Sequence, residues 1–358
     1  MPTANKTVLW WGRFDPEYSR NRILRQAFGA LGWQPREFRP SISALGAIEA
    51  ALRRLPTPDL VFVPCFRQRD IAAARRFSRA RGAPLMADPL ISAYDKQVFE
   101  RQKFSEQSPR ARRLLRWERS LLQSADSVLA DTPTHARFFS KTLGVPESKI
   151  HVVPVGAEEA LFTPAPHPPN DPIEVLFFGS FLALQGPEVI IDAARRYRGP
   201  RVRWCLIGAG PMWAECKALA AGLDSLEFHD WLPYAQLPAA IQRADIVLGV
   251  FGTSSKAGRV IPNKVYQTLA CGKPLITRSA PAYPPELTDD SASGITWVPG
   301  GDATALALAV QRLAEQRDQL AILGARSRAS YERFFSAGRI VADLGAALTA
   351  LRLTPARG

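Results

Sequence analysis

The feature that most constrains the fold of this chain is a regular alternation of short apolar runs with longer amphipathic segments. Runs rich in Val, Ile and Leu that alternate with helical patterns are typical of parallel strands covered by helices on both faces. In the first half of the chain the predicted strands are Val8–Gly12, Asp59–Cys65, Pro84–Asp88, Ser127–Asp131 and Lys149–Gly156, and the predicted helices include Ser19–Leu31, Arg69–Arg81 and Thr132–Leu143. In the second half the predicted strands are Ile173–Gly179, Val202–Gly208, Leu226–His229, Asp245–Phe251, Pro274–Thr277 and Thr296–Val298. The sequence therefore predicts an α/β protein with doubly wound sheets.

A proline-rich stretch divides the chain near its middle. Residues 163–172 contain five prolines in ten positions, and proline, which lacks an amide hydrogen and has a fixed φ, is unsuited to helix interiors and central strands. The length of 358 residues fits two domains of about 150 residues each. We therefore expect a Rossmann-like domain at 1–162, a linker at 163–172, a second such domain at 173–336, and a last helix within 337–358 that packs back across the linker. Ligands of such sheets bind at the carboxyl ends of the strands, so the expected active site is a cleft that both domains face.

Composition limits the class of protein. Apolar residues make up 46% of the chain and charged residues 22%, which excludes disordered, collagen-like and coiled-coil chains. The longest apolar runs, such as Asp245–Phe251, are far shorter than the roughly 20 residues of a membrane-spanning helix, and the run Val8–Trp11 is too short for a signal peptide. The four cysteines are scattered and form no Cys-x-x-Cys pair, so we expect neither a zinc site nor a disulfide framework. These features predict a soluble, cytoplasmic protein.

The net charge of +13 is concentrated in the first half of the chain, where residues 1–165 carry 26 Lys and Arg against 16 Asp and Glu. The densest basic segment is Arg101–Arg119, in which seven basic residues interleave with apolar ones, and Arg67–Arg81 contains six arginines. Interleaved basic and apolar residues suit an anionic membrane surface, at which the protein would be peripheral; a solvated helix face is the alternative interpretation. Nucleic acid is not an expected partner, because the chain has no zinc-finger, helix-turn-helix or RNA-binding aromatic motif.

The segment with the most chemical content is Lys256–Thr277. In it Pro262 is placed as the first residue of a helix and Gly272 as its terminator. A helix N-terminus exposes free amides and the positive end of the helix dipole, and therefore attracts anions. Arg259 lies just before this end and Lys264 in its first turn, so that together they would neutralise a diphosphate leaving group. An ordinary helix with two solvated cations is the alternative.

This segment resembles the nucleotide-binding helix of the retaining glycosyltransferases of family four, which have the GT-B fold. Further motifs in the same order are Val175–Pro187, Leu206–Pro211, Phe228–Pro233 and Ala244–Leu248. They resemble the first strand with its glycine loop, the second strand, the base-binding loop and the next strand of that family's second domain. The resemblance covers about residues 173–348 and is looser over residues 1–160.

The resemblance implies a nucleotide-diphosphate sugar bound mainly to the second domain, and a glycan, lipid-linked or other hydrophobic acceptor held mainly by the first. It further implies transfer with retained anomeric configuration at the cytoplasmic membrane face, without a required metal. The absence of any Asp-x-Asp motif, which binds metal-diphosphate in the other large glycosyltransferase fold, agrees with the metal-free expectation. Recognition of the base would rest largely on backbone hydrogen bonds near Trp231 and Leu232.

The resemblance also assigns roles to individual residues. The donor-binding residues are Gly12, Arg13, Gly179, Ser180, Gln185, Gly208, Trp231, Leu232, Pro262, Asn263 and Gln267. The catalytic residues are Asp88, Arg259 and Lys264, the acceptor-binding residues are Arg20, Asn21 and His135, and no residue is assigned to a metal. Asp88 stands where the family often has a histidine, and its carboxylate would bind a sugar hydroxyl or stabilise positive charge on the sugar; a cap at the strand end is the alternative. His135, at a helix start, fits a structural role better than acceptor binding.

Departures from the family pattern bear on activity. Arg259 and Gln267 occupy positions at which many members carry glutamates, while Ser180 and Gln185 align with an arginine and a lysine of the first glycine loop. A neutral amide at Gln267 still hydrogen-bonds ribose hydroxyls. Arg259 and Lys264 would supply the positive charge that the loop lacks.

These departures leave alternatives open. One is a degenerate GT-B subunit that binds nucleotide or a protein partner without catalysis. Another is a different two-domain nucleotide-sugar enzyme such as an epimerase, which the lack of an obvious carboxylate and histidine set disfavours. A dinucleotide dehydrogenase is disfavoured because Gly208-Ala209-Gly210 lacks the third glycine of its fingerprint.

Overall fold

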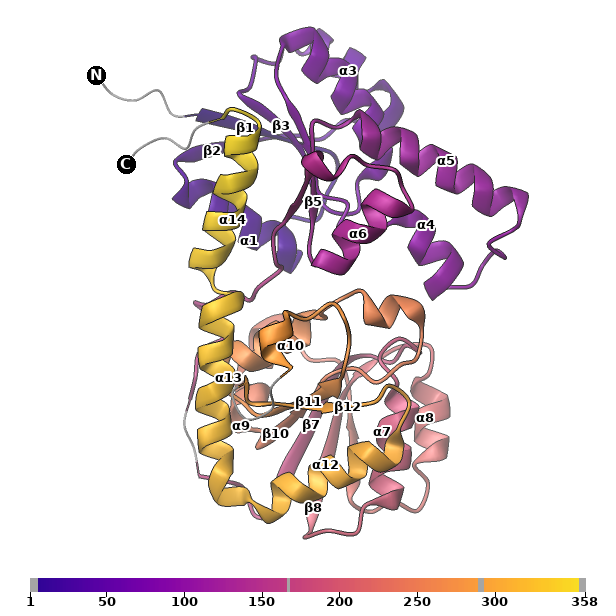
Figure 1. The fold of residues 1–358 in the computed structure, drawn as a ribbon, viewed down its shortest axis with the longest axis vertical. Coiled ribbons are helices and arrows are strands. Elements are labelled where there is room, and N and C mark those ends of the chain that lie inside the picture. Colours follow the sequence, from indigo (N-terminus) through magenta and orange to yellow (C-terminus); the bar gives the residue numbers. More distant parts are fainter. Residues whose placement is uncertain (1–5, 166–167, 289–292, 354–358) are drawn as a thin grey trace. The chain divides into compact units, whose positions relative to one another are not determined.

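The computed structural model describes residues 6–165, 168–288 and 293–353. Over these residues the chain forms two compact units. Unit 1 consists of two segments, one that ends at Val155 and one that begins at Ala337, and unit 2 comprises Gly156–Ser336. Each unit is a parallel β-sheet covered by helices (Figure 1). The α/β class with two doubly wound sheets is therefore confirmed.

The described part of unit 1 contains a six-stranded parallel sheet in the order β2-β1-β3-β4-β5-β6. The strands are β1 Lys6–Trp11, β2 Trp33–Phe38, β3 Leu60–Val63, β4 Leu85–Ala87, β5 Ser127–Ala130 and β6 Ile150–Val152. The five strands predicted for this half are present. β2 is a further strand that the apolar pattern does not predict, because it buries only Trp33 and Phe38 and contains Pro35 between them. Such a sequence is compatible with the edge of a sheet, where a strand pairs on one side only.

Two layers of helices enclose this sheet. The helices are α1 Ser19–Ala30, α2 Gly46–Leu52, α3 Ile71–Arg81, α4 Ala93–Asp95, α5 Pro109–Ser124, α6 Pro133–Lys141 and α14 Ala337–Ala350, with the short turns η1 Ser43–Leu45, η2 Gln68–Asp70, η3 Lys96–Glu100 and η4 Glu147–Lys149. α1 and α14 lie side by side and share a core with Trp10 and Phe62 of the strands (Figure 1). α2, α3, α5 and α6 contribute to a second core around Trp11. The C-terminal helix α14 is thus part of unit 1.

The described part of unit 2 contains a second six-stranded parallel sheet, in the order β12-β11-β10-β7-β8-β9. The strands are β7 Ile173–Ser180, β8 Val202–Ala209, β9 Leu226–His229, β10 Ile246–Leu248, β11 Leu275–Arg278 and β12 Ile295–Val298. The helices are α7 Pro187–Arg196, α8 Trp213–Leu219, α9 Leu237–Arg243, α10 Asn263–Ala270, α12 Ala303–Glu315 and α13 Leu320–Phe334, with the turns η5 Tyr234–Gln236, η6 Ser255–Gly258, η7 Pro285–Leu287 and η8 Arg317–Gln319. All strands predicted for this half are present. The strand order reverses direction between β7 and β10, which makes their carboxyl ends the switch point of the sheet.

Unit 2 begins before the proline-rich stretch. Phe162 is fully buried, and its ring packs edge-on against Tyr234 with centroids 5.6 Å apart. The amide of Ala157 donates a hydrogen bond to the hydroxyl of Tyr331 at 3.2 Å. The residues just after Val155 therefore belong to unit 2, because they pack on its helices, whereas the sequence places the boundary after residue 162.

Candidate active site

The loops that follow β7 and β10 meet at the switch point of unit 2. The amide of Phe251 donates a hydrogen bond to the carbonyl of Gln185 at 2.9 Å. A Cβ atom added at Gly186, whose φ is +66°, would lie 2.7 Å from the amide nitrogen of Gly252, so only glycine fits. The loop between β7 and α7 is thereby fixed against the end of β10, at the edge where doubly wound sheets bind ligands.

Lys264 occupies this edge from the first turn of α10. Its Nζ donates a hydrogen bond to Oε1 of Gln185 at 2.7 Å and lies 3.6 Å from the centroid of the Phe177 ring. The residue is 5% exposed, and burial lowers the pKa of its ammonium well below the usual range. A neutral amide and an aromatic face are weak compensation for a buried charge, whereas an anion at this position would compensate it fully.

Two glycines, Gly179 and Gly208, form the backbone beside Lys264. A Cβ atom added at Gly179, whose φ is +141°, would lie 2.8 Å from Oε1 of Gln185 and 3.2 Å from Nζ of Lys264. On β8, Gly208 approaches so closely that an added Cβ would lie 1.9 Å from the carbonyl oxygen of Gly179. Ser180, the last residue of β7, is half-buried next to them. The structure therefore brings four of the predicted donor-binding residues, Gly179, Ser180, Gln185 and Gly208, close to Lys264, which the sequence analysis assigned to catalysis.

The N-terminus of α10 differs in one detail from the predicted one. Pro262 is the cap rather than the first helical residue: its ψ of 152° is extended, and the helix begins at Asn263. The prediction for Pro262 is wrong by one position, since its carbonyl already accepts the amide of Val265 at 2.9 Å while its own backbone stays outside the helix. Gly272, with φ of +65°, ends the helix as predicted.

The remaining predicted residues of unit 2 lie around this core of the site. Arg259 closes the turn η6 ahead of α10, is half-buried, and has its Nη2 3.5 Å from Oγ of Ser255. Gln267 lies on α10 one turn after Lys264 and is 4% exposed. Trp231 and Leu232 lie in the segment after β9, where Trp231 is 59% exposed. Their roles toward a donor remain predictions.

Arg278 is a cation at this edge that the sequence analysis does not single out. It is the last residue of β11, and its Nη1 donates a hydrogen bond to the carbonyl of Gly252 at 2.5 Å. Burial lowers the pKa of its guanidinium. The signal available in the sequence is its position: an arginine at the carboxyl end of a predicted parallel strand faces the ligand edge of the sheet.

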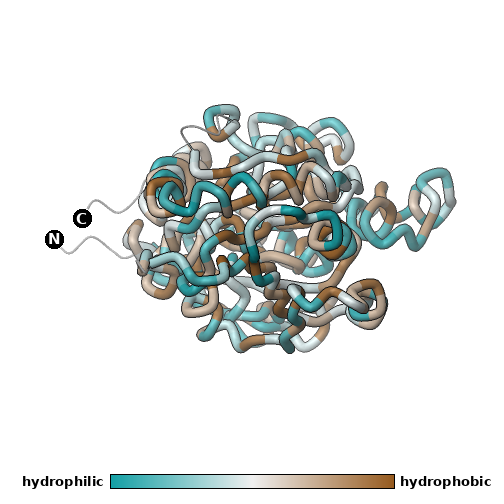
Figure 2. Tube along the Cα trace, turned by 90° about the horizontal axis from the view of Figure 1, so that it is seen from below, coloured by the Kyte–Doolittle hydropathy of each residue, from teal (hydrophilic) through white to brown (hydrophobic). Residues whose placement is uncertain are grey.

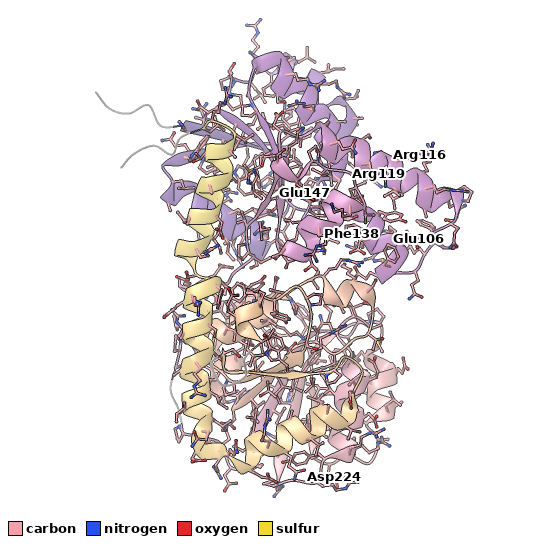
Figure 3. All side chains as sticks on the ribbon, viewed as in Figure 1. Glu106, Arg116, Arg119, Phe138, Glu147 and Asp224 are labelled. Carbon is pink, nitrogen blue, oxygen red and sulfur yellow. The ribbon has the colours of Figure 1, made fainter. Side chains whose placement is uncertain are left out.

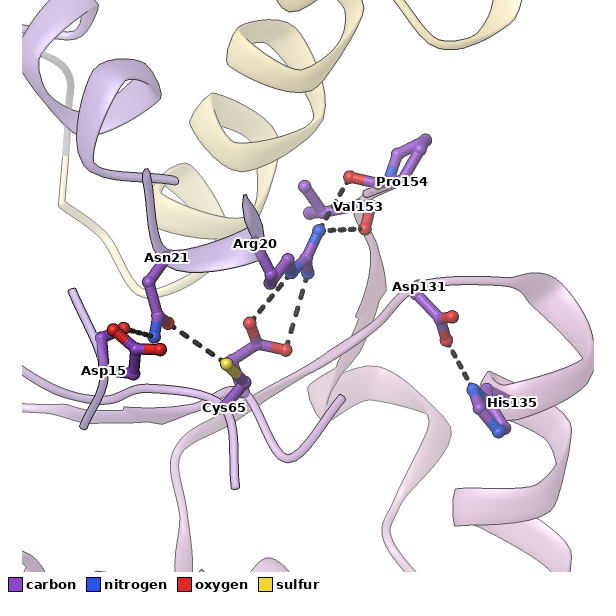
Figure 4. Close-up of polar contacts among 9 residues, drawn as sticks. Asp15, Arg20, Asn21, Cys65, Asp131, His135, Val153 and Pro154 are labelled. Atoms are coloured by element: carbon purple, nitrogen blue, oxygen red, sulfur yellow. Dashed lines mark hydrogen bonds and ion pairs between the residues drawn. The ribbon is translucent and has the colours of Figure 1, made fainter. Parts of the chain in front are cut away.

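Unit 1 carries a buried ionic network at the carboxyl ends of its strands (Figure 4). Nε of Arg20 lies 2.9 Å from Oδ2 of Asp88, and neither side chain has exposed surface. Nη1 of Arg20 donates to the carbonyls of Val153 at 2.8 Å and Pro154 at 2.6 Å. Burial raises the pKa of Asp88, against the opposing effect of Arg20. In this arrangement Arg20 and Asp88 join α1 to the ends of β4 and β6, which is a structural use of both residues.

Asn21 is also engaged within the fold. Its Nδ2 donates to the carbonyl of Asp15 at 2.7 Å, and its Oδ1 lies 3.2 Å from the thiol of Cys65. Asn21 is 1% exposed, and burial raises the pKa of Cys65. The side chain therefore holds the loop after β1 to the end of β3 (Figure 4).

His135 lies in the first turn of α6. Its Nδ1 contacts the carboxylate of Asp131 (Figure 4). Its amide donates to Oγ1 of Thr132 at 3.1 Å, and its ring stacks on Phe139 with centroids 5.7 Å apart. The side chain has no exposed surface. This placement fits the structural alternative for His135.

Gly12 and Arg13 follow β1 and differ in exposure. Gly12 has φ of +129°, and an added Cβ would lie 3.0 Å from Oδ2 of Asp70. Asp70 itself forms an ion pair with Arg67. Arg13 is exposed. The glycine is thus required by its neighbours within unit 1, while the side chain of Arg13 is available to a ligand.

Two family models match the chain. Residues 11–156 match the glycosyl transferase 4-like domain, and residues 172–316 match the domain described as glycosyl transferases group 1. The D-inositol 3-phosphate glycosyltransferase of Arthrobacter sp. is 27% identical over 221 residues, which are 57% of this chain and 51% of that protein. The O-antigen chain mannosyltransferase C of Escherichia coli is 25% identical over 234 residues, 62% of this chain and 59% of that protein. The matches thus span little more than half the length of these curated relatives.

A solved structure has the same fold over its whole length. The Anabaena protein Alr3699/HepE in complex with UDP superposes with a TM-score of 0.72 at 15% sequence identity, covering 96% of this chain and 100% of that one. The same Anabaena protein has also been solved with UDP-glucose. Two doubly wound sheets that match such neighbours define the GT-B fold. The chain belongs to the group 1 glycosyltransferases, the family-four type that the sequence motifs resemble.

The described helices include none with the length and apolarity to cross a bilayer. Across the same residues, His, Cys, Asp and Glu side chains do not gather in any group of three or more that could hold a metal ion.

Proposed function

We propose that this protein is a retaining glycosyltransferase that moves a sugar from a nucleotide-diphosphate sugar to a glycan, lipid-linked or other hydrophobic acceptor at the cytoplasmic membrane face, without a required metal. The observation that carries the proposal is the buried ammonium of Lys264 at the start of α10, beside the bare backbone of Gly179. A buried cation at a helix N-terminus, contacted by a neutral amide and an aromatic ring, favours binding of an anion.

In this proposal the diphosphate of the donor lies against Lys264 and the first amides of α10. The bond between the anomeric carbon and the diphosphate oxygen breaks, and its electron pair leaves with the diphosphate. A bond to the acceptor oxygen forms, and the proton of the acceptor hydroxyl passes to the departing diphosphate oxygen. Lys264 and the α10 dipole stabilise the negative charge that develops on the departing diphosphate. Gln185 holds the lysine in place through the 2.7 Å hydrogen bond.

Uridine nucleotides are the first donors to test. The Anabaena neighbour has been solved with UDP and with UDP-glucose, and Gln267 on α10 would hydrogen-bond the ribose hydroxyls. Trp231 and Leu232 would hold the base through backbone groups. Arg259, ahead of α10, would add a second cation at the diphosphate.

The proposed membrane contact involves α5. Ser108 caps this helix by accepting the amide of Ala111 at 3.1 Å. Its exposed cations are Arg110, Arg112, Arg113 and Arg116, and half-buried apolar residues interleave with them. Figure 3 places Arg116 at the outer side of α5, with Phe138 of α6 on the inner side. Figure 2 shows that hydrophilic and hydrophobic positions alternate closely along the chain. Cations on an anionic surface contribute about 1 kcal/mol each.

A thermal-shift panel of UDP, GDP, ADP, TDP and CDP, with and without magnesium, tests the proposal. A ligand at 100 times its Kd stabilises a protein by about 2.7 kcal/mol, which a melting scan resolves. We expect a selective shift from one diphosphate that magnesium does not change, followed by transfer or hydrolysis with the matching nucleotide sugar. A shift that needs magnesium would overturn metal independence, and no shift from any diphosphate would overturn the donor site. Anomeric analysis of the product by NMR tests retention.

A second candidate function is a GT-B subunit that binds nucleotide without catalysis. It is favoured by Arg259 and Gln267, which replace the glutamates of many family members. Nucleotide binding without hydrolysis or transfer for any sugar would support it. Turnover that Lys264→Ala abolishes would exclude it.

A further inference from the structure

Helix α2, with the preceding turn η1, exposes large aliphatic side chains along one face. Ile42, Leu45, Ile48 and Leu52 are 56%, 49%, 60% and 79% exposed. The spacing of Leu45, Ile48 and Leu52 places these three on one side of α2, and Ile42 directly precedes η1 in an extended conformation. Eleven large apolar side chains are exposed in the described part of the chain, and four of them fall within these eleven positions, which makes this the densest such surface there.

These aliphatic side chains point outward because the buried face of α2 has room only for small residues. That face consists of Gly46 and Ala50, and a Cβ atom added at Gly46 would lie 3.0 Å from the ring of Trp11. Larger residues do not fit against the sheet at this distance. The helix therefore packs through its small residues and leaves its large aliphatic residues in solvent, the reverse of an ordinary surface helix.

The surroundings of this face are basic. Arg39, Arg53 and Arg54 are exposed next to it; Arg39 pairs with Glu37 at 3.0 Å and Arg53 with Glu49 at 2.6 Å, which leaves an excess of one positive charge. Arg76 of α3 holds η1 by donating to the carbonyl of Ala44 at 2.7 Å. α3 contacts both α2 and α5, the helix of the proposed membrane contact.

We propose that the face formed by Ile42, Leu45, Ile48 and Leu52 inserts into the interfacial region of an anionic lipid surface. The four aliphatic side chains would enter the boundary between headgroups and acyl chains, while the flanking arginines bind the lipid phosphates. A second copy of the chain is a poorer occupant, because a symmetric contact would place the same arginines opposite each other. This inference deepens the membrane contact proposed for α5, and its test is independent of sugar transfer.

The first experiment reports the environment of residue 52 directly. The four native cysteines are buried, so Leu52→Cys can be labelled selectively with the environment-sensitive fluorophore NBD on the full chain. Vesicles of phosphatidylcholine with 30% phosphatidylglycerol should shift the emission to the blue and raise it at least about twofold, as insertion of a probe among acyl chains requires. The matched control is Leu308→Cys on α12, an aliphatic residue of similar exposure, 61%, whose label should not respond. Protein that floats with the vesicles while the label at residue 52 stays unchanged would overturn the proposal.

The second experiment removes the aliphatic face without touching a charge. The variant Leu45→Gln/Ile48→Gln/Leu52→Gln should lower binding to the same vesicles about tenfold or more, because exposed apolar area drives insertion. The control is Leu308→Gln/Ile322→Gln in unit 2, which should bind as the unaltered chain does. An unchanged UDP thermal shift in both variants shows that the fold and donor site are intact. Unaltered flotation of the triple variant, or an unaltered chain that is a dimer and becomes monomeric in it, would assign the face to something other than lipid.

Discussion

Nζ of Lys264 lies 2.7 Å from Oε1 of Gln185, although 79 positions separate the two residues in the chain. One residue belongs to α10 and the other to the loop after β7, so the contact spans the switch point of unit 2. The partner is a neutral amide, which fixes the position of the ammonium without cancelling its charge. The fold therefore holds a weakly compensated buried cation at the place proposed for the diphosphate of the donor.

Replacing this cation should separate stability from function. Lys264→Met keeps the length and the contact with Phe177 but removes the buried charge. We expect the free energy of unfolding without nucleotide to rise by about 1 kcal/mol or more, because an undercompensated buried charge is costly. The UDP-induced thermal shift should disappear. The control is Lys217→Met, an exposed lysine 4.9 Å from the ring centroid of Trp213. A Lys264→Met protein with the shift of the unaltered chain would disprove the diphosphate assignment.

The lowered pKa of Lys264 predicts a dependence on pH. Burial places its pKa below that of an exposed lysine, so between these two pKa values the unfolded chain binds the extra proton. The contribution of Lys264 to the free energy of unfolding therefore rises with pH across that window. A bound diphosphate favours the charged form and raises the pKa again. Binding of UDP should then take up a proton and weaken as the pH rises past the pKa of the free protein. Calorimetry at a series of pH values below the pKa of an exposed lysine, in buffers of different ionisation enthalpy, measures this uptake, and Lys264→Met should abolish it.

Substitution of the glycines near the ends of β7 and β8, Gly179 and Gly208, should have different effects on stability and on UDP binding. At Gly208 an added methyl would lie 1.9 Å from a backbone carbonyl, so Gly208→Ala should destabilise unit 2 by about 3 kcal/mol or more. At Gly179 the methyl meets side-chain ends, Oε1 of Gln185 and Nζ of Lys264, which can move. Gly179→Ala should therefore lose UDP binding at a smaller cost in stability. Gly29→Ala on α1 meets nothing within 4 Å and is the control. Urea denaturation and UDP thermal shifts distinguish these outcomes, and equal loss of stability at both positions would contradict the argument.

The Arg20–Asp88 pair should behave as a buried structural pair. Arg20→Met leaves the Asp88 carboxylate buried without its partner, which typically costs about 3–5 kcal/mol. The double variant Arg20→Met/Asp88→Leu should recover much of this loss, since no charge is then left in the interior. Arg196→Met, which removes an exposed pair with Asp192, should leave the urea curve nearly unchanged. An Asp88→Asn protein of normal stability that has lost turnover would instead favour the catalytic interpretation of Asp88.

Neutralising the cations of α5 should affect lipid binding through charge alone. In the variant Arg110→Gln/Arg112→Gln/Arg113→Gln/Arg116→Gln, flotation with anionic vesicles should weaken by about 1 kcal/mol per arginine that reaches the surface. The loss should be largest at low salt, because salt screens exposed charges. The aliphatic variant of α2 should instead lose the part of the binding that persists in high salt. The UDP thermal shift should be unchanged, and unaltered flotation would favour a solvated role for α5.

Much of the architecture could be read from local pattern. The buried strands are recognisable as Val, Ile and Leu runs between helical segments, because parallel strands are covered on both faces and must be apolar throughout. Gly179, Gly208 and the start of α10 could also be predicted from short segments. A positive φ or a helix cap needs particular residue types within a few positions. β2 was not predicted, because an edge strand needs few buried residues and the middle of β2 is exposed.

What the sequence could not determine are the contacts between residues far apart in the chain. The family resemblance gave Arg20 as an acceptor-binding residue and Asp88 as a catalytic one, and only the packing of α1 against the ends of β4 and β6 joins them in a buried ion pair. Lys264 is identifiable as a cation at a helix start, yet its burial and its amide partner depend on a loop 79 positions away. The outward aliphatic face of α2 follows from the small residues that face Trp11. Local residue types determine which segments become strands, helices and turns, whereas the environment of each charge is set by whatever the folded chain brings beside it.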